Sequence, residues 1–166
     1  MACFGNDDYD SIKDTLRTKG QGTILFLDDE LATFTIRGKT IAIIGSRGVL
    51  DQPTFWQSRN IEDIRELYAK RVLTLDSLFE EAKAISSFTI LLTHYTSTYV
   101  TLEGEVQRDF AQMGSQRIEE LLKRHTPKLA IHGHAHRGLR KAHLNKVRVY
   151  NVALPLNRQI VLIKIP

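Results

Sequence analysis

The chain alternates short apolar segments with amphipathic segments, and this alternation limits the folds open to it. Residues 40–44 and 88–93 are apolar and rich in β-branched side chains, which is typical of buried strands. Between them, apolar side chains from Ile61 to Ile85 recur at helical spacing and predict one long helix. Strands that alternate with helices favour an α/β layered domain.

Shorter signals predict the remaining elements. Residues 1–4 have the pattern of the last part of a strand, and Ser11 with Asp14 forms a capping-box pattern that predicts a short helix ending near Gly20. Residues 115–125 predict another helix, and residues 45–60 and 95–113 are interpreted as loops. Further strands are predicted over residues 23–27, 31–36 and 129–132, with a closing hairpin of residues 146–152 and 159–165.

Composition narrows the class of protein. The 166 residues contain no repeat or linker, so we expect a single domain over residues 1–166. Cys3 is the one cysteine, which excludes a disulfide framework and a cysteine-based zinc site and fits a cytoplasmic location. The apolar runs are too short to cross a bilayer, so we expect no membrane partner.

The charge of the chain is unevenly distributed. Residues 121–166 contain ten Lys and Arg and no Asp or Glu, whereas residues 1–120 carry a net charge of −6. A basic region attracts phosphate groups, either on a small substrate or on nucleic acid. A solvated surface that keeps the protein soluble explains the same pattern, and the sequence leaves both interpretations open.

Three polar clusters each come directly after a predicted strand. Residues 5–8 follow Phe4, His94 follows the strand at 88–93, and residues 132–136 follow the strand at 129–132. In α/β sheets, ligands bind beyond the carboxyl ends of the strands. We therefore expect the three clusters to form one site.

The segment from His132 to His136 carries three imidazoles at alternate positions. Neutral imidazole binds divalent zinc, iron, nickel and manganese. An exposed turn, or a core histidine bonded to backbone, is the alternative, but metal binding explains the spacing better. His94 alone would favour a structural role, and its place beside the other clusters favours a ligand. Residues 5–8 fit a simple turn as well, whereas an EF-hand would need a Gly and a distal Glu that are absent.

Three segments resemble, in the correct order, the last three signature motifs of the calcineurin-like metallophosphoesterases: Gly5-Asn6-Asp7-Asp8, Thr93-His94 and Gly133-His134-Ala135-His136. The resemblance implies a four-layer α/β/β/α metallophosphoesterase-like sandwich. It also implies hydrolysis of phosphate mono- or diesters by a water that divalent ions activate, with Mn, Fe, Ni or Zn as the candidates.

The resemblance also implies roles for single residues. Asn6, His94 and His134 would hold one metal ion, and His136 would belong to the other. Asp7 and His94 are the catalytic candidates. The family has a His at the position of Asp7, so this chain replaces an imidazolium donor with a carboxylate near the phosphate.

Two arginines are candidates for binding the phosphate group by position alone. Arg47 follows the strand at 40–44, and Arg137 follows the last motif. Positive side chains stabilise the charge that develops on a phosphoryl group. An exposed loop arginine without a substrate contact is the alternative for each.

The family has two further motifs, Asp-x-His and Gly-Asp-x-x-Asp, and neither precedes Gly5. These motifs supply a bridging Asp and two ligands of the metal to which His136 belongs. We therefore expect an N-terminally truncated sandwich with one depleted sheet, one metal or none, and weak or no activity alone. A homo-oligomer, or a partner polypeptide that supplies the motifs, would cover the exposed edge.

Three functions remain after the sequence is considered. A metal-dependent phosphoesterase, incomplete as this chain, comes first because of the ordered motifs. A non-catalytic metal-binding remnant or subunit comes second, since the ligand set is partial. A nucleic-acid-binding module that uses the basic residues comes third, because no recognised binding motif supports it.

Overall fold

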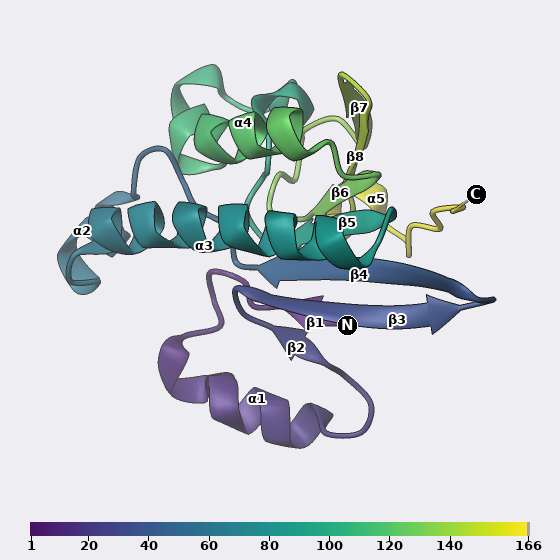
Figure 1. The fold of residues 1–166 in the computed structure, drawn as a ribbon. Coiled ribbons are helices and arrows are strands. Elements are labelled where there is room, and N and C mark those ends of the chain that lie inside the picture. The colour runs from purple at the N-terminus through teal and green to yellow at the C-terminus, as the bar shows by residue number, and fades with distance from the viewer. Residues whose placement is uncertain (166) are drawn as a thin grey trace.

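A six-stranded sheet forms the centre of the computed structural model, which describes residues 1–165 (Figure 1). Its strands, in the spatial order β3-β4-β5-β6-β8-β7, are β3 (Glu30–Ile36), β4 (Lys39–Ser46), β5 (Thr89–Thr93), β6 (Leu129–His132), β8 (Val147–Asn151) and β7 (Lys141–Leu144). The four inner strands are parallel, and β3 and β7 pair antiparallel at the two edges. The carboxyl ends of four strands therefore lie along one edge of the sheet.

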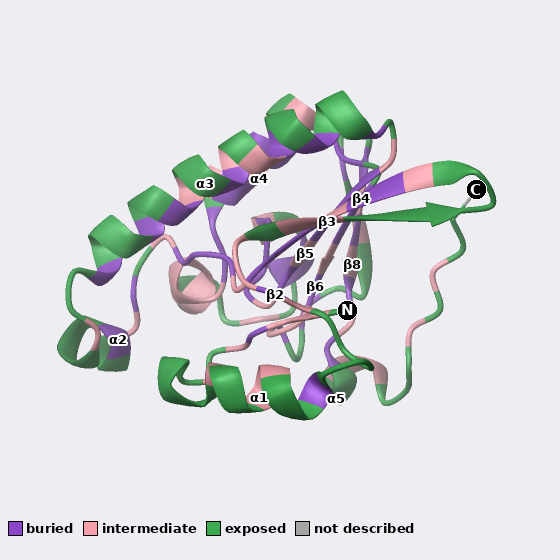
Figure 2. Ribbon diagram, turned by 60° about the horizontal axis from the view of Figure 1, so that its bottom comes forward, coloured by how far each residue is buried: buried purple, intermediate pink, exposed green. Residues whose placement is uncertain are grey.

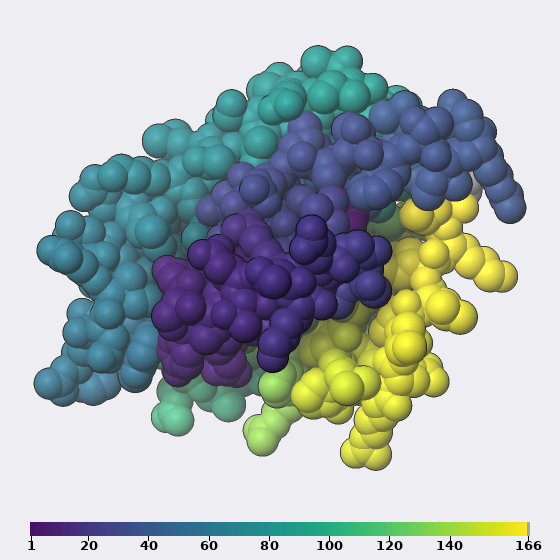
Figure 3. Space-filling model, turned by 90° about the horizontal axis from the view of Figure 1, so that it is seen from below, coloured from purple at the N-terminus to yellow at the C-terminus, as the bar shows by residue number. Residues whose placement is uncertain are grey.

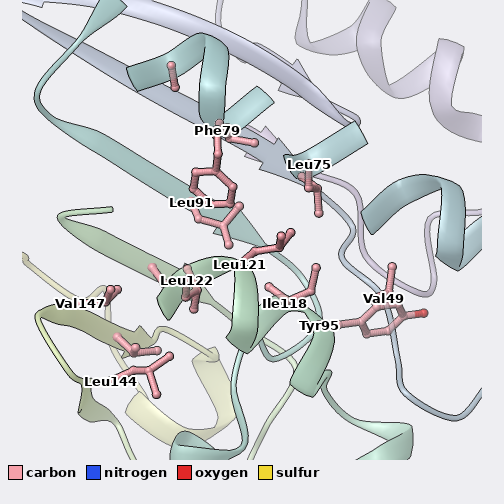
Figure 4. Packing of buried hydrophobic residues seen from close by; sticks show 14 of the residues in the cluster. Val49, Leu75, Phe79, Leu91, Tyr95, Ile118, Leu121, Leu122, Leu144 and Val147 are labelled. Atoms are coloured by element: carbon pink, nitrogen blue, oxygen red, sulfur yellow. The ribbon is translucent and has the colours of Figure 1, made fainter. Parts of the chain in front are cut away.

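Two helices, α3 (Ile64–Ile85) and α4 (Gln116–His125), cover one face of this sheet (Figure 1). The buried stripe of α3 faces the strands and its exposed residues face away (Figure 2). The core beneath them contains fully buried side chains, among them Leu75, Phe79, Leu91, Ile118 and Leu122 (Figure 4). Burying each such side chain contributes about 1.5–3 kcal/mol, so this layer holds the sheet and helices together.

A short parallel ribbon lies on the opposite face of the sheet. It consists of β1 (Ala2–Cys3) and β2 (Phe26–Leu27), and α1 (Lys13–Gly20) lies outside it (Figures 1 and 3). The ribbon approaches β4 closely because Gly45 has no side chain: a Cβ there would lie 2.3 Å from Cβ of Leu27. The architecture is thus a mixed α/β sandwich of helices, sheet, ribbon and helix, as predicted, with a second sheet of only two strands in the described chain.

The predicted loop over residues 45–60 is wrong in its second half. Residues Phe55–Asn60 form α2, which a capping box begins. The Thr54 hydroxyl accepts a hydrogen bond from the Gln57 amide at 3.2 Å, and the Gln57 side chain accepts one from the Thr54 amide at 2.9 Å. Six residues are too few for a helical period to show in the sequence.

The capping box predicted at Ser11 is also wrong. A 3₁₀ turn, Asp10–Ile12, comes first, and α1 begins at Lys13 without a side-chain cap. The Lys13 ammonium instead pairs with Asp10 at 2.8 Å and with Asp28 at 2.6 Å. These ion pairs fix the start of the helix against the turn that follows β2, and the helix ends at Gly20 as predicted.

The predicted closing hairpin is wrong in its pairing. β8 pairs with β7 across a tight turn at Asn145, whose φ of 52° is a value that Asn tolerates. After β8 the chain forms α5 (Leu154–Asn157), and residues 159–165 form no strand. In this last segment Ile160 is 85% exposed and Leu162 is 91% exposed.

The predicted irregular region 95–113 contains two 3₁₀ helices, Tyr99–Leu102 and Gln107–Gln112.

Within residues 1–165, no helix is both long enough and apolar enough to span a bilayer.

Candidate functional site

The loops after the parallel strands lie side by side at the carboxyl edge of the sheet. The last residues of the four strands are in register: Ser46, Thr93, His132 and Asn151. The pairing continues beyond the strands, because the Tyr95 amide donates to the Arg47 carbonyl at 3.0 Å and the Gly133 amide donates to the His94 carbonyl at 3.3 Å. The backbones that carry Arg47, His94 and His134 are therefore held together by hydrogen bonds.

The segment after β1 reaches the same edge from the ribbon layer. Phe4 is fully buried and stacks on Phe26 with ring centroids 4.9 Å apart, which anchors the segment. Two residues later the Asn6 side-chain oxygen accepts a hydrogen bond of 2.5 Å from Nε2 of His94. Two clusters separated by 88 positions in the sequence thus meet as predicted.

The two histidines His94 and His134 lie next to each other. Their ring centroids are 5.0 Å apart at an interplanar angle of 61°, and the Tyr95 ring lies 5.1 Å from the His134 ring. Burial, and then the neighbouring His134, lower the pKa of His94 to about 4. Burial also lowers the pKa of His134. Both imidazoles are therefore neutral at pH 7, the form in which histidine binds a metal ion.

His134 has a left-handed backbone, with a φ of 65°. A residue other than glycine in this region costs roughly 1–3 kcal/mol, and such strain gathers at functional sites. The loop is held in place by the buried Asn151 side chain, whose amide donates to the Ala135 carbonyl at 2.7 Å. With this backbone conformation, the His134 ring lies beside the rings of His94 and Tyr95.

His132 has a different environment from its two neighbours in the cluster. It is fully buried, its Nδ1 donates to the Gly133 carbonyl at 2.8 Å, and its Nε2 accepts from the Thr101 hydroxyl at 2.8 Å. Burial lowers its pKa to about 4. His132 is thus a core histidine bonded to backbone and a hydroxyl, so the alternative interpretation of the cluster holds for this one position.

A cavity of about 440 Å³ lies at this place, and four of the predicted residues line it: Asn6, Asp7, Arg47 and His134. The Asp7 carboxylate is exposed and accepts a 3.0 Å hydrogen bond from the Asn6 amide nitrogen. The Arg47 guanidinium donates to the Asp8 carbonyl at 2.6 Å, and its buried Nε has no partner. The structure brings these predicted residues together.

The other three predicted residues, His94, His136 and Arg137, lie outside the lining of this cavity. His136 and Arg137 are both exposed. His136 is close enough to lower the pKa of His94 and of His134 by its charge. The Arg137 backbone amide donates to the Glu105 carboxylate at 2.6 Å.

A metal ion needs several donor side chains that converge on one point. No group of three or more His, Cys, Asp or Glu side chains in this range is placed to hold one. The Asn6 oxygen and the neutral rings of His94 and His134 form a mixed set of one oxygen and two nitrogens, which suits a single divalent ion of the manganese-to-zinc series. An ion bound there would replace the hydrogen bond between Asn6 and His94. For a second ion, the motif residues of this range offer His136.

Several residues of the cavity wall were missed in the sequence: Tyr9, Thr54, Trp56, Gln57 and Asn60. Trp56 and Gln57 lie in the segment 45–60 that the sequence predicted to be a loop. The Thr54-x-x-Gln57 capping box was the signal that could have revealed a helix at this place.

A glycine controls how closely Asn6 approaches His94. A Cβ on Gly5 would lie 3.0 Å from both Cε1 and Nδ1 of His94, so Gly5→Ala forces the ring to shift by a few tenths of an ångström. We expect this variant to bind Mn²⁺ or Zn²⁺ about tenfold more weakly in a calorimetric titration, since ligand geometry sets affinity. Gly133→Ala is the control, because its Cβ would meet only the His94 carbonyl, at 3.9 Å. Equal losses in both variants would contradict the prediction.

Comparisons with known proteins support the fold. No protein-family model matches the chain, and no curated protein sequence matches it. A phosphopantetheinyl hydrolase from Mycobacterium tuberculosis has a similar structure, with a TM-score of 0.64 and 17% identity over 95% of this chain and 64% of that protein. A putative 5′-nucleotidase from Staphylococcus aureus, solved with α-ketoglutarate, has a TM-score of 0.58 and 17% identity over 91% of this chain and 31% of that protein.

The chain spans less than two thirds of the length of each of these structures. Their low sequence identity means that they show the fold alone. Both are folds of the metallophosphoesterase type, which agrees with the ordered motifs and with the four layers. The chain has a metallophosphoesterase-type fold.

Proposed function

We propose that this chain belongs to a metal-dependent phosphoesterase and contributes the ligands of one metal ion and part of the phosphate site. The observation that carries the proposal is the 2.5 Å contact between the Asn6 oxygen and His94, beside the neutral ring of His134. The hydrolase names of the structural neighbours support the same class of reaction.

Each residue of the site has a physical task in this proposal. A bound divalent ion would polarise phosphate oxygens and lower the pKa of a bound water. Asp7 orients Asn6, because it accepts a hydrogen bond from the amide nitrogen and so turns the oxygen toward His94. Arg47 places a positive charge on the cavity wall, where it would attract a phosphate group.

Hydrolysis assays test the proposal. We expect the purified 166-residue chain to hydrolyse 4-nitrophenyl phosphate and bis(4-nitrophenyl) phosphate little or not at all with Mn²⁺ or Ni²⁺, since a two-metal mechanism needs more ligands than this chain offers. Adding a polypeptide that carries the Asp-x-His and Gly-Asp-x-x-Asp segments should produce turnover that His134→Ala abolishes. His143→Ala, on exposed β7, is the control.

Three outcomes would lead to other conclusions. Robust turnover by the 166-residue chain that His134→Ala abolishes would show that one filled site suffices. Metal binding without turnover under either condition would favour the non-catalytic subunit. Salt-sensitive binding of nucleic acid that His134→Ala leaves unchanged would favour the third function.

We also propose that the chain associates with a second polypeptide or a second copy. The exposed apolar side chains of the ribbon layer and the last segment support this: Ile24, Leu25, Ile160 and Leu162 are between 44% and 91% exposed. Exposed apolar side chains mark contact sites where they gather into a patch. A monomer by light scattering, at high concentration and with the polypeptide described above, would contradict the proposal.

A further inference from the structure

Two aromatic rings form the outer wall of the cavity next to the candidate metal ligands. Tyr9 and Trp56 line it together with Arg47 and His134. The rings of Tyr9 and Trp56 are 5.8 Å apart at 49°, and the two residues are 52% and 50% exposed. Both residues therefore keep about half of their surface accessible, in a cavity lining that also contains the arginine.

The position of Trp56 relative to the ligands is fixed by hydrogen bonds. The capping box of Thr54 and Gln57 begins α2 one residue before Trp56. The Gln57 side-chain nitrogen donates to the Tyr95 hydroxyl at 2.8 Å, and the Tyr95 ring packs edge-on against His134 at 5.1 Å. A short chain of contacts thus connects the indole to a candidate metal ligand. Trp56 has a fixed position rather than lying free on the surface.

The size and chemistry of the cavity indicate what it holds. About 440 Å³ is within the usual range for a small-molecule site. Arg47 suits a phosphate group, and the Trp56 face suits a planar ring. The carboxylates of Asp7 and Asp10 also line the cavity, so the charge of a bound divalent ion would be needed to offset them. The side chains of Asn60 and Gln112 are also in the lining and offer amide donors and acceptors to ring heteroatoms.

We propose that this cavity binds phosphate esters whose alcohol part carries a planar aromatic ring, with the ring against Trp56, and that heteroaromatic rings such as those of nucleoside monophosphates are preferred. The proposal rests on the phosphoesterase function argued above and names its class of substrate. Stacking of a ring on an aromatic side chain contributes about 1–3 kcal/mol, which corresponds to roughly 5- to 150-fold in affinity.

The chain contains a single tryptophan, so its fluorescence reports on this one position. We expect adenosine monophosphate to quench the emission of the wild-type protein in the presence of Zn²⁺. Ribose 5-phosphate should compete with it at concentrations roughly 5- to 150-fold higher and cause no quenching of its own. Phenyl phosphate should quench but bind more weakly than adenosine monophosphate, because it cannot pair with Asn60 or Gln112.

A matched pair of variants separates ring binding from general surface effects. Phe55 is adjacent to Trp56, is 74% exposed and is absent from the cavity lining. In calorimetric titrations, Trp56→Ala should reduce the affinity for adenosine monophosphate roughly 5- to 150-fold, by no more than the factor that separates it from ribose 5-phosphate. Phe55→Ala should leave that affinity unchanged. Neither variant should change the affinity for ribose 5-phosphate.

The outcomes distinguish this inference from the proposed function. Equal affinities for ribose 5-phosphate and adenosine monophosphate, or equal losses in Trp56→Ala and Phe55→Ala, would overturn the aromatic site and leave the phosphoesterase intact. Equal affinities for adenosine and adenosine monophosphate would overturn the phosphate end, and with it both proposals. If phenyl phosphate binds more tightly than adenosine monophosphate, the preference for heteroaromatic rings is wrong.

Discussion

Lowering the pH from 7 to 4 should reduce the free energy of unfolding by about 3 kcal/mol through His132 alone. Burial lowers the pKa of this residue from 6.5 to about 4 in the folded state. Between these values the unfolded chain binds a proton that the folded chain does not, so the stability contributed above pH 6.5 is lost as the pH falls through this window. A shift of this size is worth roughly 3 kcal/mol at 1.36 kcal/mol per pH unit.

Urea unfolding at several pH values measures this effect. The loss of unfolding free energy between pH 7 and pH 4 should be about 3 kcal/mol smaller in His132→Gln than in the wild type. His94 contributes in the same direction in both proteins, because its pKa is also lowered to about 4, so it cancels in the comparison. His143→Gln, at an exposed position, should keep the wild-type slope. Parallel curves for the wild type and His132→Gln would contradict the prediction.

Asp29→Ala should cause the other large loss of folding stability, because Asp29 connects three parts of the structure. Its carboxylate accepts from Nε of Arg71 at 2.7 Å and from the Ser46 hydroxyl at 2.5 Å. Arg71, on α3, is only 9% exposed and also donates to the Gly48 carbonyl at 3.1 Å. Removing the carboxylate leaves a buried guanidinium without its charge partner, which typically costs 3–5 kcal/mol.

Asp63 provides a matched control for this variant. Both aspartates have left-handed backbones, with φ of 63° at Asp29 and 48° at Asp63. Asp63 is exposed and makes no side-chain cap hydrogen bond, so Asp63→Ala should cost about 1 kcal/mol or less through backbone preference alone. The difference between the two variants in urea unfolding should be about 3 kcal/mol. Equal losses would show that the backbone conformation, and not the ion pair, matters at Asp29.

Much of the sheet and its helices could be predicted because their patterns are long. The helix from Ile64 to Ile85 spans 22 residues, enough for its periodicity to be evident. The strand at 89–93 is short, but apolar side chains fill its middle, as expected for a strand buried on both faces. The hairpin of β7 and β8 was missed because a two-residue turn at Asn145 is a weaker signal than the proline-containing segment that follows.

The location of the candidate site could be predicted from the sequence, but the orientation of its side chains could not. The positions of Asn6, His94 and His134 after strands predicted that they meet, since strand ends share an edge. Which histidine of the cluster faces inward depends on the strand register and on the left-handed φ of 65° at His134, and neither can be read from spacing. The place of Trp56 in the cavity wall could not be predicted either, since it depends on a tertiary hydrogen bond from Gln57 to Tyr95.

The location of a bound metal ion tests the central claim most directly. Crystals grown with Mn²⁺ or Zn²⁺ and measured at the absorption edge of that metal should show an anomalous peak between the Asn6 side-chain oxygen, His94 and His134, at about 2.0–2.2 Å from each ligand atom. The peak should be absent from crystals of His134→Ala. A metal bound only elsewhere, or no peak at saturating metal while Asn6 and His94 keep their 2.5 Å hydrogen bond, would contradict the account.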